Sequence, residues 1–294
     1  MSNLDVNNLF GVKGLVAVIT GGGSGLGLAV AKALDANGAK AVYIIGRREE
    51  SLKKAAAQGV NGSIIPIQGD VTSKDSLQAA ADRIQKEQGF INVLFANSGI
   101  IGVSAASAGL PTDRTPTVKE FKDAMWKPSI EDFSQAAHVN VSGVFYTALA
   151  FLELLDEGNK RKNVEQKSNI IVTSSIAGFS RRIAAGISYS ASKAGTNHLI
   201  KTLATTFSPY KIRVNGIAPG IFPSEMTDGH SAFLNNDPSK EGGVSKQVCP
   251  LERAGSEDDI AGTALFMMSK AGGYLSGNIT VVDGGRVGEM PATY

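Results

Sequence analysis

The stretch that decides the fold is Gly14-Leu-Val-Ala-Val-Ile-Thr-Gly-Gly-Gly-Ser-Gly-Leu-Gly27. It begins as a short apolar run typical of a buried strand and continues as a glycine-rich turn. An apolar pattern at helical spacing follows from Leu26 to Leu34, and a second apolar strand is predicted near 40–45. The sequence therefore predicts a β-α-β unit with a glycine-rich loop after its first strand.

A glycine-rich loop between a strand and a helix suits the pyrophosphate of a nucleotide. Backbone N–H groups and the helix N-terminus can approach the phosphates closely where no Cβ intervenes. Glycine also serves ordinary turns, so the prediction depends on the strands and helix around the loop. The loop residues predicted to contact the nucleotide are Gly21, Gly23, Ser24, Gly25, Leu26 and Gly27.

Short apolar strands alternate with amphipathic helices along the rest of the chain. This alternation predicts a doubly wound α/β fold, in which a parallel sheet has helices on both faces, in a single domain over 1–294. Ligands bind at the carboxyl ends of the strands in such sheets. The seven predicted strands lie near 15–20, 40–45, 64–67, 91–96, 169–174, 212–218 and 279–283.

Tyr189 and Lys193 are a candidate proton-transfer pair. At positions i and i+4 of a helix their side chains project from one face, about 6 Å apart along the axis. A neighbouring ammonium favours the phenolate, and it would lower the pKa of a tyrosine from about 10 toward the range of an acid–base catalyst. The same spacing also occurs on ordinary solvated helix faces.

Taken in order, these motifs resemble the short-chain dehydrogenase/reductase family over nearly the whole chain, from about Leu15 to Gly285. The resemblance implies a Rossmann fold with a nicotinamide cofactor. It rests on the glycine loop, Gly69-Asp70-Val71, Asn97-Ser98-Gly99, Asn140, Ser175-Ile-Ala-Gly178, Tyr189-Ser-Ala-Ser-Lys193 and Pro219-Gly-Ile-Phe-Pro-Ser-Glu-Met226. The last of these segments is similar to a microbial branch of 3-oxoacyl-type reductases.

The resemblance also implies catalytic roles. Tyr189 would donate a proton, Ser175 would hydrogen-bond the substrate carbonyl, and Lys193 would lower the tyrosine pKa and hold the nicotinamide ribose. Asn140 would anchor a water beside the lysine. Ser174 is an alternative to Ser175, which matches the Ser-x-x-Gly pattern of the family better. Besides the loop, Tyr189 and Lys193, the implied cofactor contacts are Arg47, Arg48, Asp70, Val71, Asn97, Gly99, Pro219, Gly220, Phe222 and Ser224.

Two departures from the family pattern bear on these roles. Ser98 stands where alanine is usual, which adds one hydroxyl near the cofactor. The interval from Ser175 to Tyr189 is one residue longer than the family spacing, so the loop 178–188 is expected to bulge.

Arg47 favours NADP(H) as the cofactor. An acidic residue at the end of the second strand would select NAD, but Gly46-Arg47-Arg48 stands there, and an arginine can bind a 2′-phosphate. The alternative is that Arg47 and Arg48 are solvated and pair with Glu49 and Glu50.

The implied activity is NADPH-dependent reduction of a small-molecule ketone, such as a 3-oxoacyl or polyketide-type metabolite. The same residues would also serve an alcohol dehydrogenase working oxidatively. A nucleotide-binding sensor or scaffold without turnover is a further alternative, although it would not need Asn140, Ser175, Tyr189 and Lys193. No charged anchor for the substrate is identifiable from the sequence.

Composition excludes several other classes of protein. The chain has 294 residues and a net charge of +2, without a basic stripe, so nucleic acid is not an expected partner. No apolar stretch of membrane-spanning length and no signal peptide is evident. The single cysteine, Cys249, suits a reducing compartment such as the cytoplasm. The three histidines have no metal-ligand spacing, so no metal is expected.

Irregular segments interrupt the predicted alternation. An insert over 102–130 is expected to hold a short helix near Val118–Trp126, and the polar segment 156–168 reads as a surface connection. By resemblance, 222–250 would be a substrate lid. The tail 284–294 would either reach a neighbouring subunit or fray, and relatives pair into homodimers or homotetramers through helices equivalent to 131–155 and 188–207.

Overall fold

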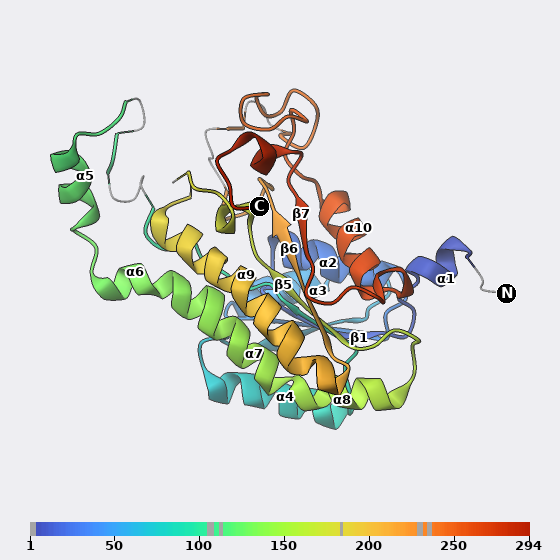
Figure 1. Cartoon of the computed structure of the whole chain (residues 1–294). Helices are drawn as coiled ribbons and strands as arrows, with labels where there is room; N and C mark the ends of the chain where they lie inside the picture. Colours follow the sequence, from blue (N-terminus) through green and yellow to red (C-terminus); the bar gives the residue numbers. More distant parts are fainter. Residues whose placement is uncertain (1–3, 105–108, 112–113, 183–184, 228–231, 234–236) are drawn as a thin grey trace.

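A computed structural model of the protein describes residues 4–104, 109–111, 114–182, 185–227, 232–233 and 237–294. Seven parallel strands form one sheet in the order β3-β2-β1-β4-β5-β6-β7 (Figure 1). They are β1 (Val16–Thr20), β2 (Ala41–Gly46), β3 (Ile64–Gln68), β4 (Val93–Ala96), β5 (Asn169–Thr173), β6 (Arg213–Pro219) and β7 (Ile279–Val282). The predicted doubly wound sheet is confirmed, and each strand end lies within two residues of its predicted place.

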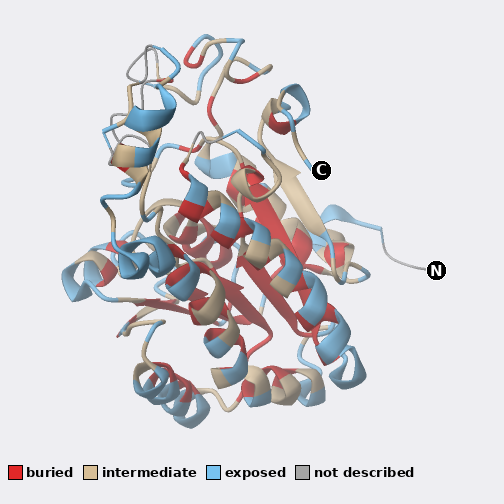
Figure 2. Cartoon of the chain, turned by 60° about the vertical axis from the view of Figure 1, so that its left-hand side comes forward, coloured by how far each residue is buried: buried red, intermediate tan, exposed pale blue. Residues whose placement is uncertain are grey.

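Helices cover both faces of this sheet, so its strands are buried on both sides except at the edge strands β3 and β7 (Figure 2). The central strands β1 and β4 are buried at every position, which explains their nearly continuous apolar sequence. Burial of this apolar surface is the main force that stabilises the fold. One face packs against α4 (Lys74–Glu87), α7 (Val144–Ala150) and α9 (Ile187–Phe207), and the other against α2 (Gly25–Ala36), α3 (Glu49–Ala56) and α10 (Glu257–Met268).

The direction of strand addition reverses between β1 and β4. The chain runs outward from β1 through β2 and β3, and then returns to place β4 on the other side of β1. Loops that leave these two strands diverge, which opens a crevice at the carboxyl edge of the sheet. Gly21 and Asn97 follow directly after β1 and β4, so both lie at this edge.

The segment 156–168 differs from its predicted form, because its first half is helical. The helix α8 (Leu152–Arg161) continues through Asp156, and the Lys160 ammonium pairs with the carboxylates of Asp156 and Glu157 at 2.7 and 2.8 Å. Ion pairs at this spacing stabilise an exposed helix, so a polar sequence did not mean an irregular one here.

The insert 102–130 does contain the short helix predicted near Val118–Trp126. It is α5 (Val118–Met125), which begins with a capping box of Thr117 and Glu120 and projects from the body of the protein (Figure 1). A further helix, α6 (Ile130–Ala137), leads back toward the sheet. Residues 105–108 and 112–113 of the insert lie outside the described part of the chain.

The tail 284–294 folds back onto its own chain. The backbone N–H of Arg181 donates to the carbonyl of Pro291 at 2.8 Å, and the N–H of Thr293 donates to the carbonyl of Phe179 at 2.8 Å. The expectation of a frayed end is therefore wrong, whereas a reach to a neighbouring subunit stays a prediction.

Among the described residues, no single helix combines the length and the apolar character that a membrane crossing requires. The bent pair Ile130–Ala150 and Leu152–Arg161 meets the criteria only when joined across a 47° bend. Its buried side chains, such as Val144 and Leu154, pack in the core beside the sheet. In the same part of the chain, no three His, Cys, Asp or Glu side chains gather in a way that could hold a metal ion.

Candidate active site

A cavity of about 820 Å³ lies along the carboxyl edge of the sheet. It extends from the loops after β1 and β2 to the loops after β5 and β6. Of the residues predicted for the cofactor and the reaction, all line it except Gly27 and Asn140. One connected space thus brings together motifs that are up to two hundred residues apart in the chain.

The glycine loop has the geometry of an anion cradle. Gly21 has a φ of +67°, which a side chain would strain, and a Cβ on Gly27 would lie 2.4 Å from the carbonyl oxygen of Gly21. Gly27 therefore allows the helix to pack against the loop. The hydroxyl of Ser24, at the N-terminus of α2, makes no capping hydrogen bond and lines the cavity. A helix N-terminus with an available hydroxyl suits a phosphate.

Asn97 joins the ends of three neighbouring strands. Its side-chain amide donates to the carbonyl of Gly21 at 3.2 Å, and its side-chain oxygen accepts from the Thr173 hydroxyl at 2.9 Å. Its backbone N–H donates to the hydroxyl of Thr20 at 3.0 Å. These contacts hold the loops after β1, β4 and β5 in one arrangement.

Ser175 and Tyr189 come together despite the longer interval between them. Both side chains line the cavity, and the Ser175 hydroxyl acts on the Tyr189 phenol to lower its pKa. The hydroxyl of Ser174, the alternative serine, instead donates to the side-chain oxygen of Asn197. Residues 183–184, within the loop expected to bulge, lie outside the described part of the chain.

The side chain of Lys193 lies beside the ring of Tyr189 and is held by the carboxyl end of β5. Its ammonium donates to the carbonyl of Thr173 at 2.7 Å and lies 5.8 Å from the centre of the Tyr189 ring. Burial lowers the pKa of Lys193 to about 8. Burial also raises the pKa of Tyr189, and the hydrogen bond with Ser175 opposes that rise. In the protein alone, burial thus outweighs the lowering of the tyrosine pKa that the sequence predicts from Lys193.

Asn140 supports the site from behind the cavity. It belongs to a π-helical turn, His138–Gly143, and its side chain accepts from the N–H of Ile100 and donates to the Ile100 carbonyl, both at 2.9 Å. It also donates to the hydroxyl of Ser192 on α9 at 2.9 Å. Its backbone carbonyl accepts from the hydroxyl of Thr196 at 2.9 Å. The predicted water-anchoring role of Asn140 stays a prediction.

Arg47 and Arg48 line the cavity after β2 but differ in their partners. Arg48 pairs with Glu225, at the start of the predicted lid, at 2.7 Å. Glu49 and Glu50 pair with Lys53 instead, so the alternative that they neutralise the two arginines does not hold. Arg47 forms no ion pair within the described residues, although it contributes to lowering the pKa of Asp70, whose largest cause is the Thr72 backbone hydrogen bond.

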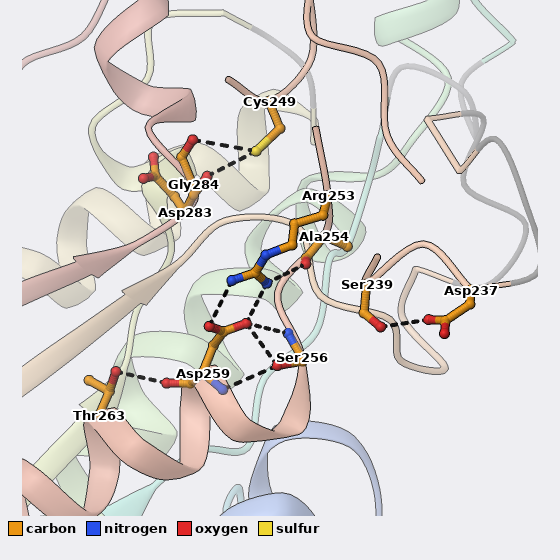
Figure 3. Close-up of polar contacts among 10 residues, drawn as sticks. All are labelled: Asp237, Ser239, Cys249, Arg253, Ala254, Ser256, Asp259, Thr263, Asp283 and Gly284. Carbon is orange, nitrogen blue, oxygen red and sulfur yellow. Dashed lines mark hydrogen bonds and ion pairs between the residues drawn. The ribbon is translucent and has the colours of Figure 1, made fainter. Parts of the chain in front are cut away.

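The predicted lid is described at 222–227, 232–233 and 237–250, and its remaining residues lie outside the description. Its far end is anchored by Arg253, whose guanidinium binds both oxygens of Asp259 at 2.6 and 3.0 Å (Figure 3). Asp259 also forms the capping box of α10 with Ser256. The sulfhydryl of Cys249 lies 3.5 Å from the carbonyl oxygen of Gly284. The lid is thus fixed to α10 and to the chain after β7.

Several residues that line the cavity belong to no motif by which the sequence could identify them. Ser180, Arg182, Arg286 and Met290 line the cavity; the first two stand in the loop after β5 and the others in the tail. The pairing of the tail with 179–181 brings these two segments side by side. The ring of Phe222, in contrast, is 5% exposed and packs against Gly255, so it belongs mainly to the core.

Comparison with known proteins identifies relatives over nearly the full length. A family model described as short chain dehydrogenase matches residues 15–234. The short-chain dehydrogenase/reductase PhomF of Diaporthe leptostromiformis is 46% identical over 98% of this chain and 96% of its own length. Versicolorin reductase stcU of Emericella nidulans is 30% identical over 93% of this chain and 96% of its own.

Solved structures agree with the fold. The Pseudomonas aeruginosa RhlG/NADP active-site complex has a TM-score of 0.75 at 25% identity, over 95% of this chain and 99% of its own. A 7α-hydroxysteroid dehydrogenase complexed with NADH and 7-oxo glycochenodeoxycholic acid has a TM-score of 0.75 at 26% identity, over 97% and 98%. Neighbours of this fold therefore include complexes with either nicotinamide cofactor.

The ion pair between Arg253 and Asp259 predicts that the stability of the fold depends on pH. The Arg253 guanidinium holds the pKa of Asp259 well below its ordinary value of 3.8, so the ion pair stabilises the fold fully above that pH and less as the pH falls through the native pKa. Arg253→Met should reduce the free energy of unfolding by about 1–2 kcal/mol at pH 7. In urea titrations, the difference from wild type should shrink below about pH 4.

Lys32→Met is the matched control, because the Lys32–Glu257 pair also reaches the first turn of α10 but leaves Glu257 64% exposed. It should change stability by less than about 1 kcal/mol. Equal losses in the two variants would contradict a special role for the Arg253–Asp259 pair.

Proposed function

The chain belongs to the short-chain dehydrogenase family, and on this premise we propose that it is an NADPH-dependent ketone reductase with Tyr189 as the proton donor. The observation that carries the proposal is that Ser175, Tyr189 and Lys193 line the same cavity as the glycine loop. Residues suited to a cofactor and residues suited to proton transfer thus face one space.

Reduction of a ketone adds a hydride at carbon and a proton at oxygen. The bound cofactor NADPH supplies the hydride and leaves as NADP⁺. The hydroxyls of Ser175 and Tyr189, which both line the cavity, would both donate hydrogen bonds to the substrate oxygen as it gains negative charge. Tyr189 then gives its proton to that oxygen, which completes the alcohol.

The burial of Tyr189 suits a proton donor. A raised pKa keeps the phenol protonated until a strongly basic alkoxide forms beside it. Lys193, whose pKa is lowered to about 8, lies close enough to stabilise the phenolate that remains. Asn140 would complete a proton path from the lysine to solvent, as the family resemblance implies.

The cofactor proposal rests on charges at the end of β2. Arg47 lines the cavity and has no carboxylate partner in the described part of the chain, so its guanidinium is available to a 2′-phosphate. Ser24 offers a free hydroxyl and the N-terminus of α2 for phosphate groups. These features favour NADP(H) over NAD(H).

One of the relatives supports the proposed direction and setting of the reaction. A versicolorin reductase among them supports reduction of a ketone or polyketide-type metabolite in secondary metabolism, and the similarity of Ile221–Met226 to 3-oxoacyl reductases agrees with it. We further propose a cytoplasmic homodimer or homotetramer, formed through the helices over 131–155 and 188–207. A sensor without turnover is disfavoured, because it would not need Ser175 together with the buried Tyr189 and Lys193.

Replacing the proton donor tests the activity. Tyr189→Phe should lower kcat/KM for ketone reduction by about 10²–10⁴-fold, because it removes the acidic proton and little else. The dissociation constant for NADPH should stay close to that of wild type. Tyr210→Phe, at a tyrosine that is 57% exposed, is the control and should leave both values unchanged.

Full activity of Tyr189→Phe on a good substrate would contradict the assignment. Tight NADPH binding by wild type without turnover across a broad panel of ketones would favour the sensor.

Cofactor choice can be tested at Arg47. Arg47→Asp should weaken NADPH by roughly 10- to 100-fold, because it replaces a charge-assisted contact with repulsion of the 2′-phosphate. Binding of NADH should change much less. Lys54→Asp, on the exposed surface of α3 and away from the cavity, makes the same charge change as a control. If Arg47→Asp weakened the two cofactors alike in fluorescence titrations, the 2′-phosphate argument would be wrong.

A further inference from the structure

The cavity has two arginines at each of two distant places. Arg47 and Arg48 follow β2, whereas Arg182 lies beyond Ser175 in the loop after β5, and Arg286 follows β7. In the sheet order, β2 and β7 are five strand positions apart, which corresponds to about 24 Å across the strands. The second pair of arginines is therefore too far from the first to bind the same phosphate.

The cofactor would leave the second pair without a counter-ion. Its phosphates would be held by the glycine loop after β1 and by Arg47 after β2, both on one side of the sheet. Ser175 and Tyr189 lie toward the other side, where the nicotinamide and the ketone would meet. Positive charges beyond Ser175 thus face the substrate end of the cavity.

The protein offsets the charge of these two guanidinium groups only in part, because Asp283 acts on Arg286 from beyond ion-pair distance. Within the described residues, neither Arg182 nor Arg286 forms an ion pair with a carboxylate. Asp283, the nearest candidate, accepts hydrogen bonds from the backbone N–H groups of Gly285 and Val287 at 2.9 and 2.6 Å. Its carboxylate is therefore engaged in the turn after β7.

Arg286 keeps most of its hydrogen-bonding capacity. One of its guanidinium nitrogens donates to the carbonyl of Val248, at the lid, at 3.1 Å, and this is one of five possible donors. Burial lowers the pKa of Arg286; the charges of Cys249 and Asp283 oppose this shift, and the nearby charge of Arg182 adds to it. Arg182 is exposed and Arg286 half-buried, and two cations close together at the cavity wall would be stabilised by an anion between them.

We propose that Arg182 and Arg286 bind a carboxylate on the substrate, so that the enzyme reduces a ketone that also carries a free acid. This inference rests on the proposed function for the reaction itself. A planar carboxylate matches the fork of a guanidinium and can accept two parallel hydrogen bonds. The antiparallel pairing of the tail with 179–181 holds the two arginines on one wall, and Met290 adds an apolar surface beside them.

Matched pairs of acid and ester test the proposal. The probes are 3- and 4-acetylbenzoate and their methyl esters, titrated calorimetrically into the NADP-loaded protein. At least one acid should bind roughly 10- to 100-fold more tightly than its ester, which is the loss expected when a charged group loses its partner. Arg182→Gln and Arg286→Gln should each reduce this preference, and the double variant should abolish it.

Arg181→Gln is the matched control. It removes the same charge one residue away, its side chain does not line the cavity, and its backbone contact with Pro291 is kept. Arg286→Lys should retain part of the preference for the acid because the positive charge remains. This variant therefore distinguishes binding of the carboxylate by Arg286 from a purely structural role of its hydrogen bond to Val248. If Arg286→Gln does not fold, Arg182→Gln and Arg286→Lys decide the question. NADPH affinity should be unchanged in all of these variants.

The outcomes separate this proposal from the function it rests on. Equal binding of acids and esters, failure of every acid to bind, or a preference that survives in the double variant would overturn the carboxylate site. NADPH-driven reduction of ketones could still be observed in that case. Arginine-dependent binding of the acids without any NADPH oxidation would instead refute the reductase and keep the anion site.

Discussion

The side-chain amide of Asn97 is the constraint on which the site depends. It contacts Gly21 after β1 and Thr173 at the end of β5, while its backbone contacts Thr20. The Thr173 carbonyl in turn accepts from Lys193. A short chain of hydrogen bonds therefore connects the glycine loop to Lys193, which lies beside Tyr189. Because each link is a strand end held by the sheet, cofactor and substrate oxygen can be positioned against each other without a rigid lid.

The sequence predicted those features of the fold and the site that depend on the residues of a single segment. The seven strands were predictable because a strand buried on both faces needs a continuous apolar run, as in Val16–Thr20. The glycine loop was predictable because Gly21 and Gly27 leave no room for a side chain. Ser175, Tyr189 and Lys193 belong to spaced motifs, and the fold brings them to one cavity as the resemblance implied.

Other features depend on contacts between distant segments, which no local pattern records. Arg286 reaches the cavity through the turn after β7, which Asp283 holds by hydrogen bonds to Gly285 and Val287. Phe222 was expected among the cofactor contacts, but no local pattern shows that its ring packs against Gly255. The direction of the Tyr189 pKa shift could not be derived from Lys193 alone, because the extent of burial is a property of the folded chain.

The π-helical turn at His138–Gly143 limits which insertions and deletions this helix tolerates. A π turn holds one more residue than the α turn it replaces, and each residue of an α-helix adds about 100° of rotation. Deleting one residue before Asn140 would restore a regular helix, but it would rotate either Asn140 away from Ile100 or α7 away from the sheet. An insertion or deletion in this helix is therefore tolerated only together with a second one that compensates for it. A substitution on its exposed face, in contrast, leaves the orientation of Asn140 unchanged.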